Sequence, residues 1–239
     1  MSLSTEIFEQ IFSSVVPSLV LQLAAWQEAA PRFRSFVETY RDKIRKKVRG
    51  AQVDGGLDDV LAELAVAALL LRDRRLAVEF EKLGVGKGRA PDLTVTFKTH
   101  TPFHVEVTRL RPPEADGTDE VDALVRKIAN TFLAKLGQLQ PSIINLLAFV
   151  VDEQSASTHE IQAAVEGLRS HAVQKDDPFF ARHGLVNSRH FQRQQARLSG
   201  VLLCTFTPPA GPRLTALWLN PQARHPVPTE LKNLLRTLV

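Results

Sequence analysis

The pattern of apolar and polar positions divides the chain into helices and strands in a definite order. Apolar residues recur every three to four positions in the segments that we expect to be helical, and Pro31 starts a new segment within the first of them. Shorter runs that alternate, or that are continuously apolar, predict strands. The helices are expected at 4–49, 57–71, 119–139, 158–171, 188–198 and 229–238. The strands are expected at 75–81, 93–97, 103–109, 143–151, 200–207 and 213–219.

This order of elements predicts an α/β fold with a mixed central sheet between helices. The run at 143–151 is almost entirely apolar, which is typical of a strand buried on both faces. We expect an N-terminal helical extension at 1–50, followed by one α/β domain at 51–239. Within that domain the elements of 57–151 form an α-β-β-β-α-β core, and an αββα addition follows it.

Composition narrows the class of protein. Of 239 residues, 44% are hydrophobic and 23% are charged, which excludes a disordered chain and allows a sizeable core. Cys204 is the single cysteine, so a disulfide framework and a cysteine-built zinc site are excluded, and a reducing, cytoplasmic location is expected. No apolar run is long enough to span a membrane, and Glu6 and Glu9 stand where a signal peptide needs positive charge.

The net charge is +4, from 30 Lys and Arg against 26 Asp and Glu, and it permits a nucleic-acid partner without requiring one. Much of the positive charge gathers in RDKIRKKVRG, at the end of the second helical segment. One interpretation is a solvated helix end whose cations suit the helix dipole. The other is contact with a phosphate backbone, and the segment GVGKG at 84–88 adds a further cation near such a surface. The candidate contacts are Lys43, Arg45, Lys46, Lys47, Arg49 and Lys87.

Glu63 stands in the middle of the apolar face of the helix expected at 57–71. Its neighbours on that face include Val60 and Ala67. A buried carboxylate needs a partner, because an unpaired charge in the interior costs several kcal/mol. The partner is either an arginine such as Arg72 or Arg75, or a ligand in a polar pocket.

Two further carboxylates fall on neighbouring strands. Asp92 follows Pro91 at the entry of one strand, and Glu106 lies on the polar face of the next, together with His104 and Thr108. A short hairpin between these strands brings Glu106 back beside Asp92. Two converging carboxylates suit a hard dication such as Mg²⁺, completed by water and substrate phosphate. The alternative is an exposed sheet face with ordinary polar residues.

This arrangement resembles the PD-(D/E)xK nuclease superfamily, which has the restriction-endonuclease-like fold. The resemblance rests on Glu63 in a helix, on Pro91-Asp92 and on Glu106-Val107-Thr108 fourteen residues later, within 57–151. It implies that Asp92 and Glu106 bind Mg²⁺ or Mn²⁺, with Glu63 as a third acidic group. It also implies a lysine at position 108, where this chain has Thr108, which cannot supply that charge.

A substitute lysine is available on the helix expected at 119–139. Lys135 lies close to the apolar stripe of this helix, so it either extends along apolar surface or meets the carboxylates. Some members of the superfamily carry their lysine on this helix with a glutamine near the phosphate, which implies roles for Lys135 and, secondarily, Gln138. Lys98 in the hairpin loop is a weaker substitute because loops are normally solvated.

The leading hypothesis is therefore a metal-dependent nuclease that hydrolyses phosphodiester bonds in DNA or RNA. Its candidate catalytic residues are Glu63, Asp92, Glu106, Lys135 and Gln138. The main alternative is a catalytically inactive protein of the same fold that binds nucleic acid or protein, and Thr108 favours it. A further possibility is a homodimer formed through the apolar N-terminal helical segment between Ile7 and Leu23.

Overall fold

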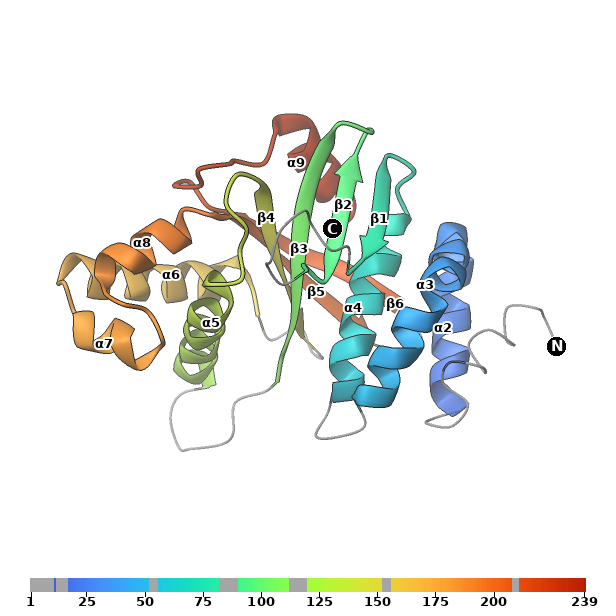
Figure 1. Cartoon of the computed structure of the whole chain (residues 1–239), viewed down its shortest axis with the longest axis horizontal. Helices are drawn as coiled ribbons and strands as arrows, with labels where there is room; N and C mark the ends of the chain where they lie inside the picture. The colour runs from blue at the N-terminus through green and yellow to red at the C-terminus, as the bar shows by residue number, and fades with distance from the viewer. Residues whose placement is uncertain are drawn as a thin grey trace.

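The computed structural model of the chain describes residues 11, 17–51, 56–81, 90–111, 120–151, 156–207 and 211–239, which contain both helices and strands (Figure 1). The helices are α2 (Pro17–Ala29), α3 (Pro31–Gly50), α4 (Gly56–Leu71), α5 (Glu120–Leu136), α6 (Thr158–Val173), α7 (Asp177–Arg182), α8 (Ser188–Gln195) and α9 (Thr229–Thr237). The strands are β1 (Leu76–Phe80), β2 (Leu93–Phe97), β3 (Thr101–Leu110), β4 (Ile144–Val151), β5 (Leu198–Thr207) and β6 (Gly211–Leu219).

The six strands form one mixed sheet in the order of the sequence, β1-β2-β3-β4-β5-β6. Strand β2 is antiparallel to both of its neighbours, β1 and β3; β3, β4 and β5 are parallel, and β6 returns antiparallel to β5. The parallel pairs need long crossovers, which α5 and the segment α6–α8 supply. From α4 to β4 the elements follow the order helix, three strands, helix, strand.

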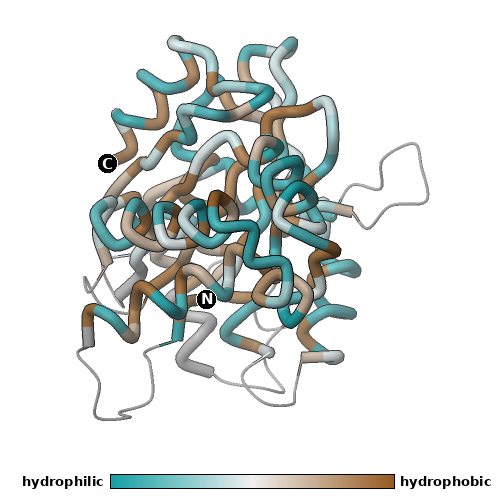
Figure 2. The backbone as a smooth tube through the Cα atoms, turned by 90° about the vertical axis from the view of Figure 1, so that its left-hand side faces the viewer, coloured by the Kyte–Doolittle hydropathy of each residue, from teal (hydrophilic) through white to brown (hydrophobic). Residues whose placement is uncertain are grey.

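Helices cover both faces of the sheet, and each face has its own hydrophobic cluster (Figure 1). Helices α2, α3, α4 and α9 pack on one face, and α5, α6, α7 and α8 pack on the other. Every residue of β4 is buried, and its side chains alternate between the two clusters, with Leu146 in one and Leu147 in the other. The prediction of a strand buried on both faces is confirmed. Seen from the side of α6–α8, the nearest helices carry both hydrophilic and hydrophobic positions (Figure 2), as expected of helices with one face on the core.

The two described N-terminal helices share the core of the sheet rather than standing apart from it. Trp26 of α2 and Phe33 and Phe36 of α3 are buried in the same cluster as α4 and β1. Phe36 also meets Phe80 of β1 edge-on, with ring centroids 6.1 Å apart. This packing fixes the position of α3 against α4, and it therefore decides where the basic end of α3 lies.

The α/β class and the mixed sheet are confirmed, and the C-terminal addition requires a correction. The stretch 174–187 contains α7, and α8 ends at Gln195 rather than near residue 198, so three helices precede the last two strands. Helix α7 has only six residues, and tertiary contacts support it: the Asp176 side chain caps it, and Phe180 stacks on Phe191 of α8 at 4.8 Å.

Among the described helices, none has both the length and the apolar content needed to cross a membrane. The apolar segment expected to form a dimer begins at Ile7, and residues 1–10 and 12–16 lie outside the described residues. The homodimer therefore stays a prediction.

Candidate active site

Asp92 and Glu106 lie side by side where β2 begins. Leu93 pairs with Val105 across the antiparallel strands, so Asp92 and Glu106 are the next residues along the two strands. Both are buried, with exposed fractions of 4% each, which excludes the alternative of an ordinary exposed sheet face. Oδ2 of Asp92 accepts a hydrogen bond of 2.8 Å from the backbone N–H of Val107. The hairpin therefore holds the two carboxylates in neighbouring, fixed positions.

Glu63 approaches Asp92 from α4, which packs on the face of the sheet opposite to α5. Residues 60–71 of this helix are all buried, including Glu63. Burial, and then the negative charge of Asp92, raise the pKa of Glu63 to about 8, although the nearby Lys47 opposes this shift. The negative charge of Asp92 is therefore close enough to Glu63 to disfavour its ionised form.

The partner of Glu63 is Lys47, and the expectation of Arg72 or Arg75 in this role is wrong. Nζ of Lys47 lies 2.6 Å from Oε2 of Glu63 and 2.7 Å from Oε1 of Glu81. Burial lowers the pKa of Lys47, but the surrounding carboxylates more than offset this and leave the pKa above its ordinary value. Arg75 instead pairs with Asp73, beyond the end of α4.

Lys135 comes from α5 and meets the acidic group on the opposite side. Its Nζ lies 3.9 Å from Oε2 of Glu106 and 3.5 Å from Oε1 of Gln138, and only 17% of its side chain is exposed. Glu106 points toward α5 because its strand neighbours Val105 and Val107 face the α4 side. The inward orientation that the helical pattern predicted for Lys135 is confirmed, and its side chain meets a carboxylate.

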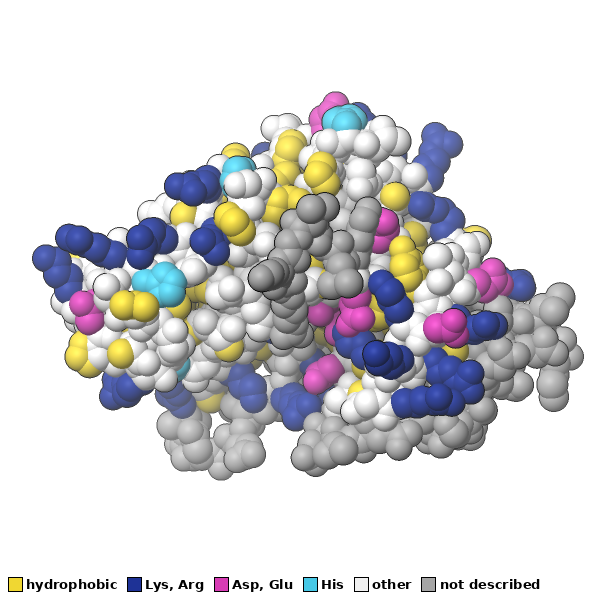
Figure 3. All heavy atoms as spheres, viewed as in Figure 1, with side chains coloured by type: hydrophobic (Ala, Val, Ile, Leu, Met, Phe, Trp, Pro, Cys, Tyr) yellow, Lys and Arg dark blue, Asp and Glu magenta, His cyan; other side chains and the backbone are white. Residues whose placement is uncertain are grey.

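Glu63, Asp92 and Lys135 line a polar cavity of about 260 Å³, and Glu106 adjoins it through its contact with Lys135. Its wall combines acidic groups from α4 and from the residue before β2 with basic groups from the end of β3 and from α5. The cavity therefore suits a negatively charged ligand together with a cation. On the exposed face of the molecule, acidic and basic side chains gather together over α3 and α4 (Figure 3). The lining residues are Asp59, Glu63, Asp92, Val107, Thr108, Arg109, Arg111 and Lys135.

Two residues of the cavity, Arg109 and Arg111, were not predicted from the sequence. Arg109 forms an ion pair with Asp58, and Arg111 lies 3.9 Å from Asp59, both at the start of α4. Arg109 occupies the far end of β3 from its hairpin, three residues after Glu106. Because successive side chains of a strand point to opposite faces, Arg109 lies on the face covered by α4 and Glu106 on the face covered by α5, so the strand pattern alone did not indicate that Arg109 reaches the cavity.

His104 precedes Glu106 on the same face of β3. Its Nδ1 is buried and makes no hydrogen bond with any described residue, and burial lowers the pKa of its imidazole. The ring is therefore biased toward its neutral form.

The basic end of α3 lines a second, more open cavity of about 690 Å³ that borders the first one. Asp59 and Asp92 belong to the walls of both cavities. Lys43, Lys46 and Lys47 line the second cavity, and Lys43 donates to the backbone carbonyls of Phe80 and Glu81 at 3.3 and 3.1 Å. Arg45 and Arg49 are exposed and do not line it, and Lys87 lies outside the described residues.

The donor set fits a hard cation in its chemistry but is not a complete metal cage. Among the described residues, no group of three or more His, Cys, Asp or Glu side chains is arranged to hold a metal. Mg²⁺ commonly binds one or two carboxylates and fills its remaining positions with water and substrate phosphate. The buried, adjacent carboxylates of Asp92 and Glu106 meet that requirement, while Glu63 is engaged by Lys47.

The raised pKa of Glu63 predicts a specific dependence of stability on pH. Folded Glu63 holds its proton up to pH about 8, whereas the unfolded side chain releases it near 4.5. The stabilisation is therefore complete below pH 4.5 and is lost as the pH rises toward 8. The free energy of unfolding should fall through this window by at most about 1.4 kcal/mol per pH unit from this group.

Glu63→Gln should remove this part of the slope, as measured by urea unfolding at a series of pH values. Glu28→Gln, at an exposed position of α2, is the matched control and should leave the slope as it is. Equal slopes for the wild-type chain and Glu63→Gln would contradict the assignment.

Comparison of the chain with protein-family models, with curated proteins and with solved structures finds no match. The function must therefore be argued from the geometry of the site.

Proposed function

We propose that this protein is a metal-dependent phosphodiesterase of nuclease type, similar to the PD-(D/E)xK superfamily, that acts on DNA or RNA. One observation carries the proposal. Two buried carboxylates are neighbours where β2 begins: Asp92 lines the cavity together with Lys135, Arg109 and Arg111, and Glu106 lies 3.9 Å from the ammonium group of Lys135. The restriction-endonuclease-like topology belongs to the same proposal, and the order of elements from α4 to β4 supports it.

In this proposal Asp92 and Glu106 hold Mg²⁺ or Mn²⁺. When bound, the dication lowers the pKa of a coordinated water molecule and neutralises charge on the scissile phosphate. Glu63 and Lys47 belong to the surroundings of this site. The hydrogen bond from Lys47 holds Glu63 in place on the wall of the cavity, and the raised pKa of Glu63 limits the negative charge next to Asp92.

The basic side chains of the cavity would bind the phosphate. In hydrolysis a water oxygen forms a bond to phosphorus, one ester P–O bond breaks, and the departing oxygen takes up a proton. Negative charge builds up on the non-bridging oxygens meanwhile. The ammonium group of Lys135 can donate hydrogen bonds to these oxygens, and Gln138 orients that ammonium through its side-chain oxygen. Arg109 and Arg111 supply further positive charge on the β3 side.

The inactive alternative also has observations in its favour. Thr108 lines the cavity where the superfamily has its lysine, and the side chain of Glu63 is already engaged by a hydrogen bond from Lys47. A protein of this kind would bind nucleic acid through the same basic groups without cleaving it.

Metal removal separates the two proposals. We expect the purified chain with millimolar Mg²⁺ or Mn²⁺ to cleave fluorescently labelled DNA or RNA, and excess EDTA to stop the cleavage. Isothermal titration with Mn²⁺ should also detect binding. Metal binding without cleavage of single-stranded or double-stranded substrates would favour the inactive alternative, and the absence of both would contradict the metal site.

A further inference from the structure

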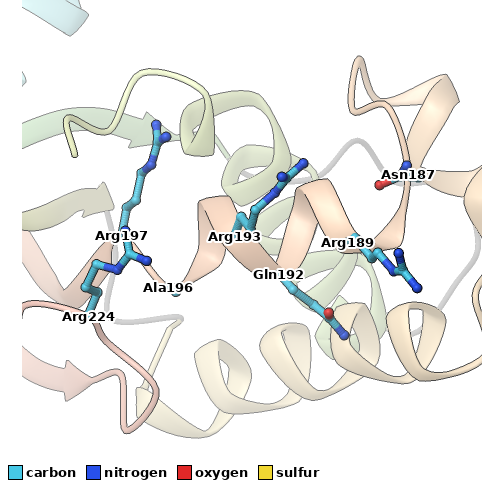
Figure 4. A pocket seen from close by; sticks show the side chains of 7 residues that line it. All are labelled: Asn187, Arg189, Gln192, Arg193, Ala196, Arg197 and Arg224. Carbon is cyan, nitrogen blue, oxygen red and sulfur yellow. The ribbon is translucent and has the colours of Figure 1, made fainter.

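A second charged cavity lies away from the candidate active site, along α8. It encloses about 750 Å³ and is open to solvent. Three of its arginines, Arg189, Arg193 and Arg197, follow one another at intervals of four residues, and Arg224 joins them from the loop after β6 (Figure 4). The complete lining is Asn187, Arg189, Gln192, Arg193, Ala196, Arg197 and Arg224.

The packing of α8 presents these arginines to solvent. Phe191 is fully buried and stacks on Phe180, so the opposite side of the helix faces outward. Arg189 and Arg193 are accordingly exposed, and Arg193 and Arg197 extend to the same side in Figure 4. Dark-blue basic side chains gather over α8 in Figure 3.

The backbone fixes the fourth arginine beside the other three. The N–H of Arg224 donates to the carbonyl of Ala196 at 2.7 Å, and Asn220 donates to the carbonyls of Gln195 and Leu198 at 3.1 and 2.8 Å. The loop after β6 is therefore tied to the junction of α8 and β5. The fold therefore fixes the backbone positions from which the four arginines extend.

The charge of this cavity is not compensated from within. No Asp or Glu belongs to its lining, and none of its four arginines forms an ion pair with a described carboxylate. Asp177 is close to Arg189, but its carboxylate accepts a hydrogen bond of 2.9 Å from the backbone N–H of Ser188 at the start of α8. Four uncompensated guanidinium groups favour a ligand with several negative charges.

The spacing of the arginines fits a phosphate backbone. Arg189 and Arg193, four residues apart on α8, are separated by about 6 Å along the helix axis, close to two phosphate intervals of about 3.4 Å along one strand of a duplex. Arg197 follows two residues after the end of α8. The lining contains no aromatic side chain on which a base could stack. Contacts of this kind position a nucleic acid without reading its sequence.

The cavity also adjoins the helix that carries the candidate catalytic lysine. Nη1 of Arg197 donates to the carbonyl of Leu139 at 3.2 Å, and Leu139 lies just beyond α5, four residues after Lys135. The Nδ2 of Asn145, at the start of β4, donates to the carbonyl of Arg197 at 3.1 Å. A strand held along α8 would thus lead toward the end of α5 where Lys135 and Gln138 lie.

We infer that Arg189 and Arg193 of α8, together with Arg197 and Arg224, form a second binding surface that holds the phosphate backbone of a nucleic acid outside the hydrolytic cavity. The inference rests on the proposed function for the identity of the polyanion. The arginine surface positions the strand, and the cavity at Asp92 and Glu106 receives the phosphate to be cleaved.

The test measures binding without cleavage, with a fluorescein-labelled 20-base-pair duplex, as DNA and as RNA, in EDTA at several salt concentrations. For the double variant Arg189→Ala/Arg193→Ala we expect affinity to fall roughly tenfold or more for any sequence. The slope of log affinity against log salt should decrease by about 1.8, since each phosphate contact contributes about 0.9.

The matched control is Arg74→Ala/Arg236→Ala, which removes the same charge from exposed positions after α4 and on α9. Affinity and salt slope in the control should stay near the wild-type values. Equal losses in both double variants, no loss in either, or no binding of either duplex by the wild-type chain would overturn the inference.

Metal-dependent cleavage, measured separately, distinguishes this failure from failure of the proposed function. Cleavage that depends on Asp92 but not on the α8 arginines would overturn only the second surface. Binding that depends on these arginines without any cleavage would support the surface and reject the nuclease.

Discussion

Asp92→Asn should abolish metal-dependent cleavage, with a loss on the order of 10²–10³-fold or more. The substitution keeps the size of the side chain and removes its negative charge, and a neutral amide is a poor ligand for Mg²⁺ compared with a carboxylate. Initial rates of cleavage of a labelled substrate at saturating Mg²⁺ measure the effect. Titration with Mn²⁺ should show weaker binding in the same variant, because half of the proposed carboxylate pair is lost.

The fold should survive this change. The side-chain oxygen of asparagine can still accept the hydrogen bond from the N–H of Val107, so the cost in stability should be limited to about 1 kcal/mol. Asp59→Asn is the matched control: Asp59 lines the same cavity but is exposed at its edge and pairs loosely with Arg111. Full activity in Asp92→Asn, or an equal loss in Asp59→Asn, would contradict the assignment of Asp92 as a metal ligand.

The elements of the sheet were predictable because their patterns arise from burial along the strand itself. The apolar run of β4 signals a strand covered on both faces, and the turn between β2 and β3 fixes which residues become neighbours. The adjacency of Asp92 and Glu106 followed from that turn alone. Helix α7 was not predicted, since its six residues depend on the cap from Asp176 and on contacts between α7 and α8.

The position of Lys47 could not be derived from local sequence. A run of six cations at the end of a helix is typical of a solvated surface, and only the packing of α3 on α4 turns one of them toward Glu63. A partial signal existed: Tyr40, Ile44 and Lys47 share one stripe of α3, on which Ile44 is buried. The apolar stripe of α5 predicted the inward orientation of Lys135, and the stripe of α3 would have predicted the orientation of Lys47 in the same way.

The candidate site is therefore assembled from segments that are distant in the sequence and approach the start of β2 from both faces of the sheet. Helix α4 brings Glu63 from one face, and α5 brings Lys135 from the other. Sequence patterns identify the orientation of each side chain relative to its own helix or strand. They do not give the distances between elements, and these decide which of the cations meets which carboxylate.

The second large effect is expected for Lys135→Gln, with a loss of about 10²–10³-fold in kcat and a smaller change in KM. The ammonium group is proposed to bind the non-bridging oxygens most strongly in the transition state, so its removal should slow the chemical step more than it weakens substrate binding. Lys127→Gln, which removes the same charge from the same helix outside the cavity, should have little effect on kcat. A loss of kcat in Lys127→Gln equal to that in Lys135→Gln would contradict a local role.

Restoring the charge from a different element tests whether Lys135 replaces the lysine that the superfamily carries on β3. Thr108 lines the same cavity and stands two residues after Glu106 on the same side of the strand. The double variant Lys135→Gln/Thr108→Lys should therefore recover a substantial part of kcat, because an ammonium group again enters the cavity beside Glu106. Mere repair of folding would raise the melting temperature without restoring kcat, so both are measured on the same samples. Cleavage that stays lost while the double variant folds and binds Mn²⁺ would contradict the equivalence of the two positions.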